Sequence, residues 1–337
     1  MTEPEPLLWA AVLVAGCASL SAVLIFFFRP LLVQHLMAHP NARSSHKTPT
    51  PQGAGLAVML SVFAGTALAI LTAPPLGAPS LVPILVIACG LTIFGGIDDW
   101  LTLPVSWRFL GQALAAAALV LSLPEGFQLF PGLMPLPLER ALIAVGIVWF
   151  INAVNFLDGL DWMTVVQVVP IALAIAILNG LGAVPATIAV LALALLGAVL
   201  GFAVFNKHPA QIFLGDAGSL PIGLCLAFML IFVAKTHLAA ALILALYTMA
   251  DSTITLVRRI RAKEPILSAH RTHFYQRGVA AGLSVPQVTA RVLLLQILLA
   301  VLAIATVLIP TLPAALLCLG LGVLATALLL HALANGR

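Results

Sequence analysis

The chain has 337 residues, of which 62% are hydrophobic and only 8% are charged. This composition excludes a soluble globular protein, because such domains carry about 25% charged residues. The formal net charge of +4 comes mainly from segments between apolar runs, which could meet anionic lipid headgroups or an anionic substrate. We expect no nucleic-acid partner.

The apolar residues form runs of the length that a membrane-spanning helix needs, about 20 residues. Eleven such runs are predicted, at residues 8–28, 53–72, 81–97, 107–123, 139–156, 163–180, 185–205, 217–234, 238–257, 287–309 and 312–334. They lack the alternating pattern of barrel strands. The sequence therefore predicts an all-α polytopic membrane protein with about 11 transmembrane helices, forming one integral membrane domain over residues 1–337.

Basic residues are distributed unevenly between the predicted loops. With a periplasmic N-terminus, the cytoplasmic side holds thirteen of them: Arg29, Arg43, Lys47, Arg108, Lys207, Arg258, Arg259, Arg261, Lys263, Arg271, Arg277, Arg291 and Arg337. Only Arg140 and Lys235 fall outside. Because cytoplasmic loops are enriched in Lys and Arg, we predict a periplasmic N-terminus and a cytoplasmic C-terminus.

The first inner loop, residues 39–55, is basic and rich in proline and glycine. Arg43, His46 and Lys47 could donate hydrogen bonds to a phosphate. The alternative is an ordinary basic loop that follows the charge asymmetry of membrane proteins.

The second inner loop begins with Asp98 and Asp99, directly after a long apolar run. Adjacent carboxylates repel each other, and each raises the pKa of the other unless a cation or a basic group is near. We interpret the pair as functional, although a polar helix terminus is the alternative.

The third inner loop follows the fifth run and carries two amides and two carboxylates. On a helix, Asn152, Asn155 and Asp158 step by three and would share one side, and Gly159 permits a turn before Asp161. Such oxygen atoms suit a hard cation such as Mg²⁺, and they can equally bind a nucleobase or a ribose. A simple break between two helices is the alternative.

Asp216 lies between small residues in the segment Gly215–Ser219, where the eighth run begins. A carboxylate at a helix start suits a metal ligand, and the neighbouring N–H groups favour an anion. Asp216 could instead be an N-cap.

The longest inner loop contains His270, Arg271, His273 and Arg277. A zinc site is disfavoured, because no cysteine or carboxylate adjoins the two histidines and no His-Glu-x-x-His pattern is present. We interpret these residues as donors to phosphate or sugar oxygens, with a lipid-surface segment as the alternative. Asp251, inside the ninth run, is expected to pair with a neighbouring helix for structure, with a catalytic role as the alternative.

In combination these segments resemble the polyprenyl-phosphate N-acetylhexosamine-1-phosphate transferases, which include the enzymes that initiate O-antigen, enterobacterial common antigen and peptidoglycan synthesis. The matching stretches are Ser44–Gly55, Gly96–Asp99, Asn152–Asp161, Gly215–Ser219 and His270–His273. The number of predicted spans, eleven with a cytoplasmic C-terminus, resembles that of the O-antigen branch of the family. Departures from the family pattern are Ala38 and His39 in the first loop, Thr102 in place of an acid, Trp162 in place of glycine, and the absence of three consecutive histidines.

The resemblance implies transfer of a sugar 1-phosphate from a UDP-N-acetylhexosamine to undecaprenyl phosphate, with release of UMP, at the cytoplasmic face of the bacterial inner membrane. It implies Mg²⁺, with Mn²⁺ as an alternative, and leaves a homodimer open. We expect Asp216 to be the main metal ligand and Asn155 the second. The expected base or orienting group is Asp98, with support from Asp99. The expected substrate contacts are Lys47, Asp158, Asp161, His270, Arg271 and His273.

A cation-coupled membrane transporter is the alternative function. It predicts charged residues spread through the membrane depth. Here five aspartates gather at one end of the predicted helices, and Asp251 is the one clear acid within the membrane depth. This distribution favours an enzyme.

Overall fold

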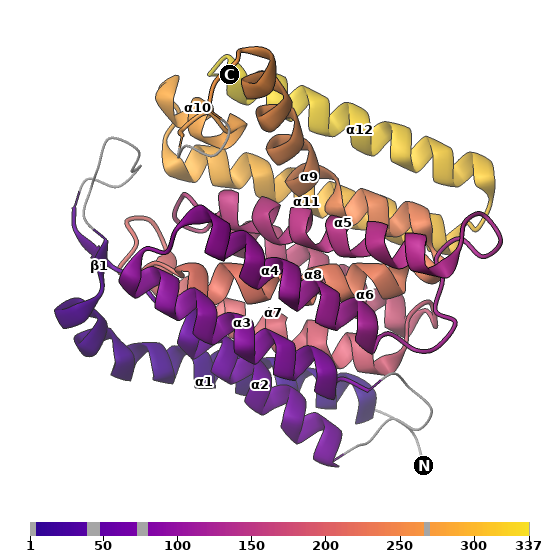
Figure 1. Ribbon diagram of the computed structural model, residues 1–337, viewed down its shortest axis with the longest axis horizontal. Coiled ribbons are helices and arrows are strands. Elements are labelled where there is room, and N and C mark those ends of the chain that lie inside the picture. The colour runs from indigo at the N-terminus through magenta and orange to yellow at the C-terminus, as the bar shows by residue number, and fades with distance from the viewer. Residues whose placement is uncertain (1–4, 39–47, 73–79, 266–269, 337) are drawn as a thin grey trace.

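The computed structural model describes residues 5–38, 48–72, 80–265 and 270–336 (Figure 1). Within these residues, eleven helices are long and apolar enough to cross a membrane. They are α1 (Glu5–His35), α2 (Gly55–Thr72), α3 (Val82–Leu101), α4 (Val105–Ser122), α5 (Leu136–Phe156), α6 (Met163–Gly180), α7 (Ala186–Asn206), α8 (Asp216–Thr236), α9 (Leu238–Arg261), α11 (Val285–Leu308) and α12 (Leu312–Ala334). The predicted all-α fold with 11 spans is confirmed.

Three small elements were not predicted, and all lie at the same end of the bundle. The helix α10 (Phe274–Ala280) follows α9, and the strands β1 (Met37–Ala38) and β2 (Thr50–Pro51) form an antiparallel pair after α1. Residue Gln52 then bridges to Phe213, which leads into α8. The strand pair therefore joins the first inner loop to the start of α8.

Helix α8 lies at the centre of the bundle, in contact with α2, α3, α5 and α9. Every residue from 217 to 233 is buried. A helix that is apolar on all sides is expected in the interior of a large helical protein. The outer helices α1 and α12 expose many large apolar side chains, as a lipid-facing surface would.

Glycines let the first turn of α8 approach its neighbours closely. A β-carbon at Gly55 would lie 2.1 Å from the backbone nitrogen of Gly218, and one at Gly95 would lie 2.3 Å from the carbonyl oxygen of Asp216. Small residues permit such backbone approach between membrane helices. The backbones of α2 and α3 thus fix the position of Asp216.

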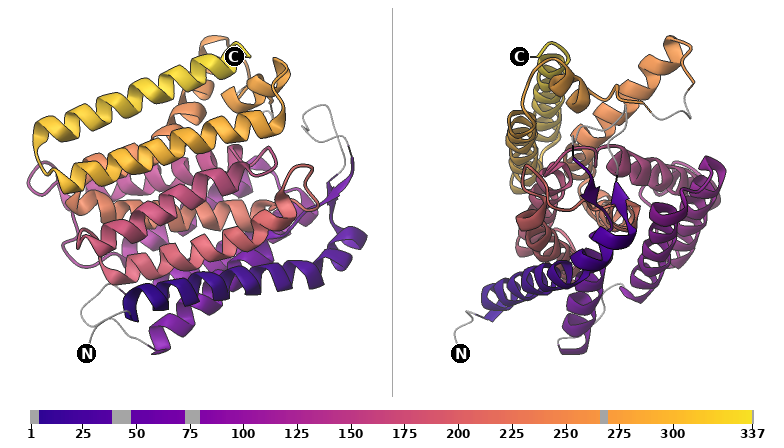
Figure 2. Two further views of the ribbon diagram at one scale, coloured as in Figure 1. Left: turned by 180° about the vertical axis from the view of Figure 1, so that it is seen from behind. Right: turned by 90° about the vertical axis from the view of Figure 1, so that its left-hand side faces the viewer.

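The described parts of the inner-loop segments lie together at one end of the bundle, the end at which Figure 1 labels β1 and α10, and Figure 2 shows the same bundle from two further sides. Because the number of crossings is odd, α1 begins at one end and α12 finishes at the other. Arg140 and Lys235 lie at the end opposite the inner loops, in keeping with the predicted charge asymmetry. The assignment of the termini to membrane sides, and the single domain, stay predictions.

Candidate functional site

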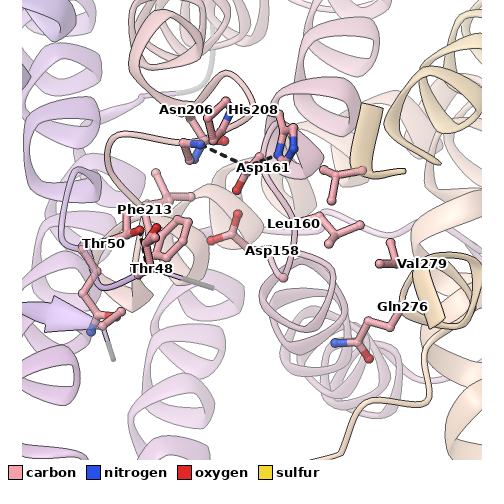
Figure 3. A pocket seen from close by; sticks show the side chains of 18 of the residues that line it. Thr48, Thr50, Asp158, Leu160, Asp161, Asn206, His208, Phe213, Gln276 and Val279 are labelled. Carbon is pink, nitrogen blue, oxygen red and sulfur yellow. Dashed lines mark hydrogen bonds and ion pairs between the residues drawn. The ribbon is translucent and has the colours of Figure 1, made fainter. Parts of the chain in front are cut away.

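A cavity of about 880 Å³ lies at the inner-loop end of the bundle (Figure 3). Its walls come from the β1–β2 region, the end of α3, the α5–α6 and α7–α8 loops, α10 and the start of α11. Five of the predicted site residues line it: Asp99, Asn155, Asp158, Asp161 and Asp216. Segments more than 100 residues apart in the chain therefore meet in one place.

Asp216 is the first residue of α8 and is bound by an amide from α5. The Asn155 side-chain nitrogen Nδ2 donates to Asp216 Oδ1 at 2.7 Å and is 2.8 Å from Ser219 Oγ. Asp99 accepts from the backbone N–H groups of Asp216 and Ala217, and Asp98 precedes it in the chain, so three acids gather at the start of α8. Neighbouring carboxylates repel one another, so the site suits a bound cation.

Asp99 caps the N-terminus of α8 from the neighbouring helix α3. Its Oδ1 accepts from the backbone N–H of Asp216 at 2.8 Å, and its Oδ2 accepts from that of Ala217 at 3.1 Å. Gly215, the residue before Asp216, has φ = 77°. A β-carbon at Gly215 would lie 2.4 Å from Asp99 Oδ2. Asp99 therefore satisfies the first free N–H groups of the helix and fixes the turn that presents Asp216.

Asp98 is buried, with only 3% of its surface exposed, and does not line the cavity. Its Oδ1 accepts from the backbone N–H of Leu103 at 2.7 Å, and its Oδ2 is 2.8 Å from Arg108 Nε. The adjacent carboxylates thus point to different partners. Asp98 orders the α3–α4 connection and holds the Arg108 guanidinium near the acids.

Asp158 lies in the α5–α6 loop and accepts a hydrogen bond from the Thr164 hydroxyl. Burial raises the pKa of Asp158 to about 7, while the Thr164 hydrogen bond opposes the shift and the Asp99 charge adds to it. Desolvation disfavours the ionised carboxylate. A positive charge entering the cavity would favour the ionised form again.

Asp161, in the same loop, binds the α7–α8 loop beside His208 (Figure 3). Its Oδ2 is 2.6 Å from His208 Nδ1 and accepts from the backbone N–H of Ala210 at 3.0 Å. The next residue, Trp162, has φ = 65°, in the left-handed region of backbone conformation. This conformation is energetically unfavourable for a bulky side chain. Hydrogen bonds from its backbone and indole N–H groups, to Asn206 Oδ1 and the Ala203 carbonyl, hold it there.

The predicted substrate residues His270, Arg271 and His273 do not line the cavity. His273 is buried, and its Nδ1 is 3.1 Å from Asp251 Oδ1. Asp251 also accepts from the backbone N–H groups of Phe274 and Tyr275, so it caps α10. The structural role expected for Asp251 is therefore observed. Lys47 lies outside the described residues.

His270 stacks on His273, with ring centroids 4.9 Å apart. Burial lowers the pKa of His270 to about 4, and the His273 and Arg259 charges add to the shift. His270 is therefore neutral at pH 7 and can offer a phosphate a hydrogen bond without a charge.

Tyr275 ties α10 to the α5–α6 loop. Its hydroxyl donates to the Phe156 carbonyl at 2.9 Å, and a β-carbon at Gly159 would lie 2.1 Å from that hydroxyl oxygen. The glycine thus leaves the space that the tyrosine occupies. Through this contact the His270–His273 segment is fixed relative to Asp158.

Several cavity residues were missed by sequence reasoning, namely Thr48, Thr50, Gln52, Asn206, His208, Phe213 and Gln276. Asn206 and His208 are polar residues directly after the apolar run 185–205. This position at the end of a predicted span could have identified them as candidate site residues. In contrast, Asn152 does not line the cavity, because its side chain contacts Gln112 of α4.

The donor set fits a magnesium ion that keeps water ligands. No three His, Cys, Asp or Glu side chains among the described residues are grouped as a complete protein-held metal site. Mg²⁺ usually takes one or two carboxylates together with waters and substrate phosphates. Asp216 and the Asn155 carboxamide supply such a partial set, whereas both oxygens of Asp99 already accept backbone hydrogen bonds.

The fold and the cavity define a polytopic membrane protein with an acidic site at one end of its helical bundle. The family model described as glycosyl transferase family 4 matches residues 81–234. A decaprenyl-phosphate N-acetylglucosaminephosphotransferase of Mycobacterium leprae is 32% identical over 311 residues, covering 78% of this chain and 76% of the relative. A probable undecaprenyl-phosphate N-acetylglucosaminyl 1-phosphate transferase of Bacillus subtilis is 31% identical over 263 residues, covering 73% and 70%.

A phospho-N-acetylmuramoyl-pentapeptide-transferase of Symbiobacterium thermophilum is 31% identical over 259 residues, covering 69% of this chain and 75% of the relative. The chain belongs to glycosyl transferase family 4, the polyprenyl-phosphate N-acetylhexosamine-1-phosphate transferases. It is an enzyme of this class. Family membership confirms the resemblance read from the sequence and sets aside the transporter alternative.

Proposed function

We propose that the enzyme transfers N-acetylglucosamine 1-phosphate from UDP-N-acetylglucosamine to undecaprenyl phosphate, with release of UMP. The observation that carries the proposal is the convergence of Asp99, Asn155, Asp158, Asp161 and Asp216 on one cavity at the inner-loop end of a membrane bundle. Two relatives named for N-acetylglucosamine transfer support this choice of sugar. The proposed site faces the cytoplasm, where a soluble nucleotide sugar is available and basic loops gather.

In this reaction an oxygen of the lipid phosphate attacks the β-phosphorus of the nucleotide sugar. The bond from that phosphorus to the bridging oxygen breaks, and the bridging oxygen leaves with UMP. A phosphate monoester loses its second proton near pH 6, so the acceptor is already a dianion at neutral pH. Catalysis then depends chiefly on positioning and on neutralising charge.

The residues of the chain divide these tasks. Asp216 and Asn155 would hold Mg²⁺, which when bound neutralises the diphosphate and polarises its oxygens. Asp99 positions Asp216 through the α8 N-terminus. Asp98 acts as an orienting group, since its carboxylate holds the Arg108 guanidinium.

Asp158, Asp161 and the aromatic Phe213 line the part of the cavity proposed for the uridine (Figure 3). Carboxylates can accept hydrogen bonds from the base and the ribose hydroxyls. Lys47, His270 and Arg271 remain the proposed contacts of the diphosphate and the sugar, whereas the buried His273 is proposed to position this segment through Asp251. The lipid tail would stay in the bilayer, beside the exposed apolar faces of the outer helices.

The test is turnover of the purified enzyme with labelled undecaprenyl phosphate and a panel of UDP-N-acetylhexosamines. We expect UDP-N-acetylglucosamine to give a lipid diphosphate sugar and an equal amount of UMP. A lipid product from another nucleotide sugar alone would overturn the sugar assignment, and release of UDP in place of UMP would overturn the reaction.

Metal removal is expected to stop turnover. EDTA should reduce the transfer rate to background, and Mg²⁺ or Mn²⁺ added in excess should restore it, because oxygen donors bind such hard cations. The measurement is the initial rate of UMP release before and after each addition. Full activity in EDTA would contradict a metal role for Asp216 and Asn155.

A further inference from the structure

Two arginines from different helices share one phenylalanine ring on the far side of α10 from the cavity. The Arg258 guanidinium carbon is 5.3 Å from the centroid of the Phe274 ring, and that of Arg277 is 5.5 Å from it. A guanidinium over an aromatic face is attracted by the ring quadrupole. Phe274 itself is buried, so the ring is a fixed platform for both cations.

Neither arginine has an acidic partner among the described residues. The ion pairs found there involve Arg108, His208, Arg259 and His273. Arg277 donates instead to the Ala334 carbonyl at 3.4 Å. Burial lowers the pKa of Arg277, and the Arg258 charge adds to the shift. Two like charges are thus held close together without an anion to offset their repulsion.

The last turns of α9 expose apolar side chains and then basic ones, as expected where a helix emerges from a membrane. The apolar side chains Ile254, Val257 and Ile260 are 41%, 39% and 52% exposed. The basic residues Arg261 and Lys263 follow and are also exposed. This part of α9 projects from the bundle in the right-hand view of Figure 2. Apolar residues followed by cations suit the boundary between acyl chains and headgroups.

We propose that Arg258 and Arg277 bind the phosphate headgroup of an anionic phospholipid from the surrounding leaflet, with the apolar residues of α9 against its acyl chains. Guanidinium groups bind phosphate oxygens through paired N–H donors. Anionic lipids make the cytoplasmic leaflet surface negative and attract basic segments there. The bound phosphate supplies the counter-charge that the protein does not.

This site is separate from the reaction cavity and goes beyond the proposed function. Gln276 and Val279 face the cavity from α10, whereas Phe274 and Arg277 lie on its other side by helical spacing. The phosphate of the acceptor has to reach Asp216, which is on the cavity side. A lipid bound at Arg258 and Arg277 would instead contact the side of α10 that faces away from the cavity.

The test is lipid retention by the intact purified enzyme, measured by native mass spectrometry after equilibration with equal amounts of phosphatidylglycerol and phosphatidylcholine. We expect the wild type to retain phosphatidylglycerol preferentially. R258Q and R277Q should each weaken this retention about fivefold, because each removes a guanidinium that donates directly to the lipid phosphate. R29Q removes one exposed positive charge from the same end of the bundle, on α1, and should leave retention unchanged.

A second measurement uses the unmodified chain and does not depend on how the variants fold. A photoactivatable phosphatidylglycerol should crosslink to peptides that contain residues 254–263 or 274–277. Equal retention by wild type, R258Q and R277Q would overturn the proposal. So would an equal loss in R29Q, or crosslinks confined to other helices. Both readouts are binding measurements, so they stand whether or not the proposed sugar transfer is correct.

Discussion

D216N is expected to lower the transfer rate at least about 100-fold, the scale found when one preorganised charge-stabilising group is removed from an active site. The variant keeps the shape of the side chain and an oxygen that can accept from Asn155 Nδ2. It removes the negative charge that would hold Mg²⁺. The measurement is the initial rate of UMP release at saturating Mg²⁺ and both substrates.

The fold of D216N should be unaffected, because the carboxylate makes no backbone contact among the hydrogen bonds found in the described residues. Thermal melting of the purified variant is the check. The matched control is E125Q, the same change of carboxylate to amide at an exposed residue at the opposite end of the bundle. Activity of D216N within about twofold of E125Q would show that Asp216 is not in the reaction.

D99N is expected to lower both activity and stability, unlike D216N. Asp99 accepts from two backbone N–H groups at the start of α8, and an asparagine has only one acceptor oxygen. Loss of one of the two hydrogen bonds costs about 0.5–1.5 kcal/mol, and a misplaced Asp216 should lower transfer by about 10–100-fold, as for groups that orient a metal ligand. Melting and UMP release are measured on the same preparation.

The comparison of the two variants separates positioning from chemistry. If Asp99 were itself a free metal ligand or base, D99N would lose activity while melting like the wild type. Such a result would contradict the capping role derived from its two hydrogen bonds. E125Q again supplies the baseline for both measurements.

The membrane helices could be predicted because their signal is local. Runs of apolar residues about 20 long leave few alternatives, and the predicted bounds 163–180 and 312–334 are those of α6 and α12. The strand pair and α10 could not be found in this way. Helix α10 has seven residues, and its N-terminus is capped by Asp251, which lies on α9 more than 20 residues earlier.

The acidic cluster was predicted from composition, because carboxylates at the ends of apolar runs are costly without a function. Their individual contacts depend on tertiary structure. Asn152 and Asn155 are three residues apart on α5, yet one contacts Gln112 on α4 and the other Asp216 on α8. Asp99 likewise meets a backbone 117 residues further along the chain.

The metal position tests the central claim most directly. Crystals of the wild type grown with Mn²⁺ and a nucleotide sugar would be measured for anomalous scattering. The convergence of Asp216 and Asn155 predicts one strong peak beside these two residues, inside the cavity that Asp158 and Asp161 also line. A peak at another cleft, or at the end of the bundle near Arg140 and Lys235, would contradict a single divalent ion at this cluster of acids.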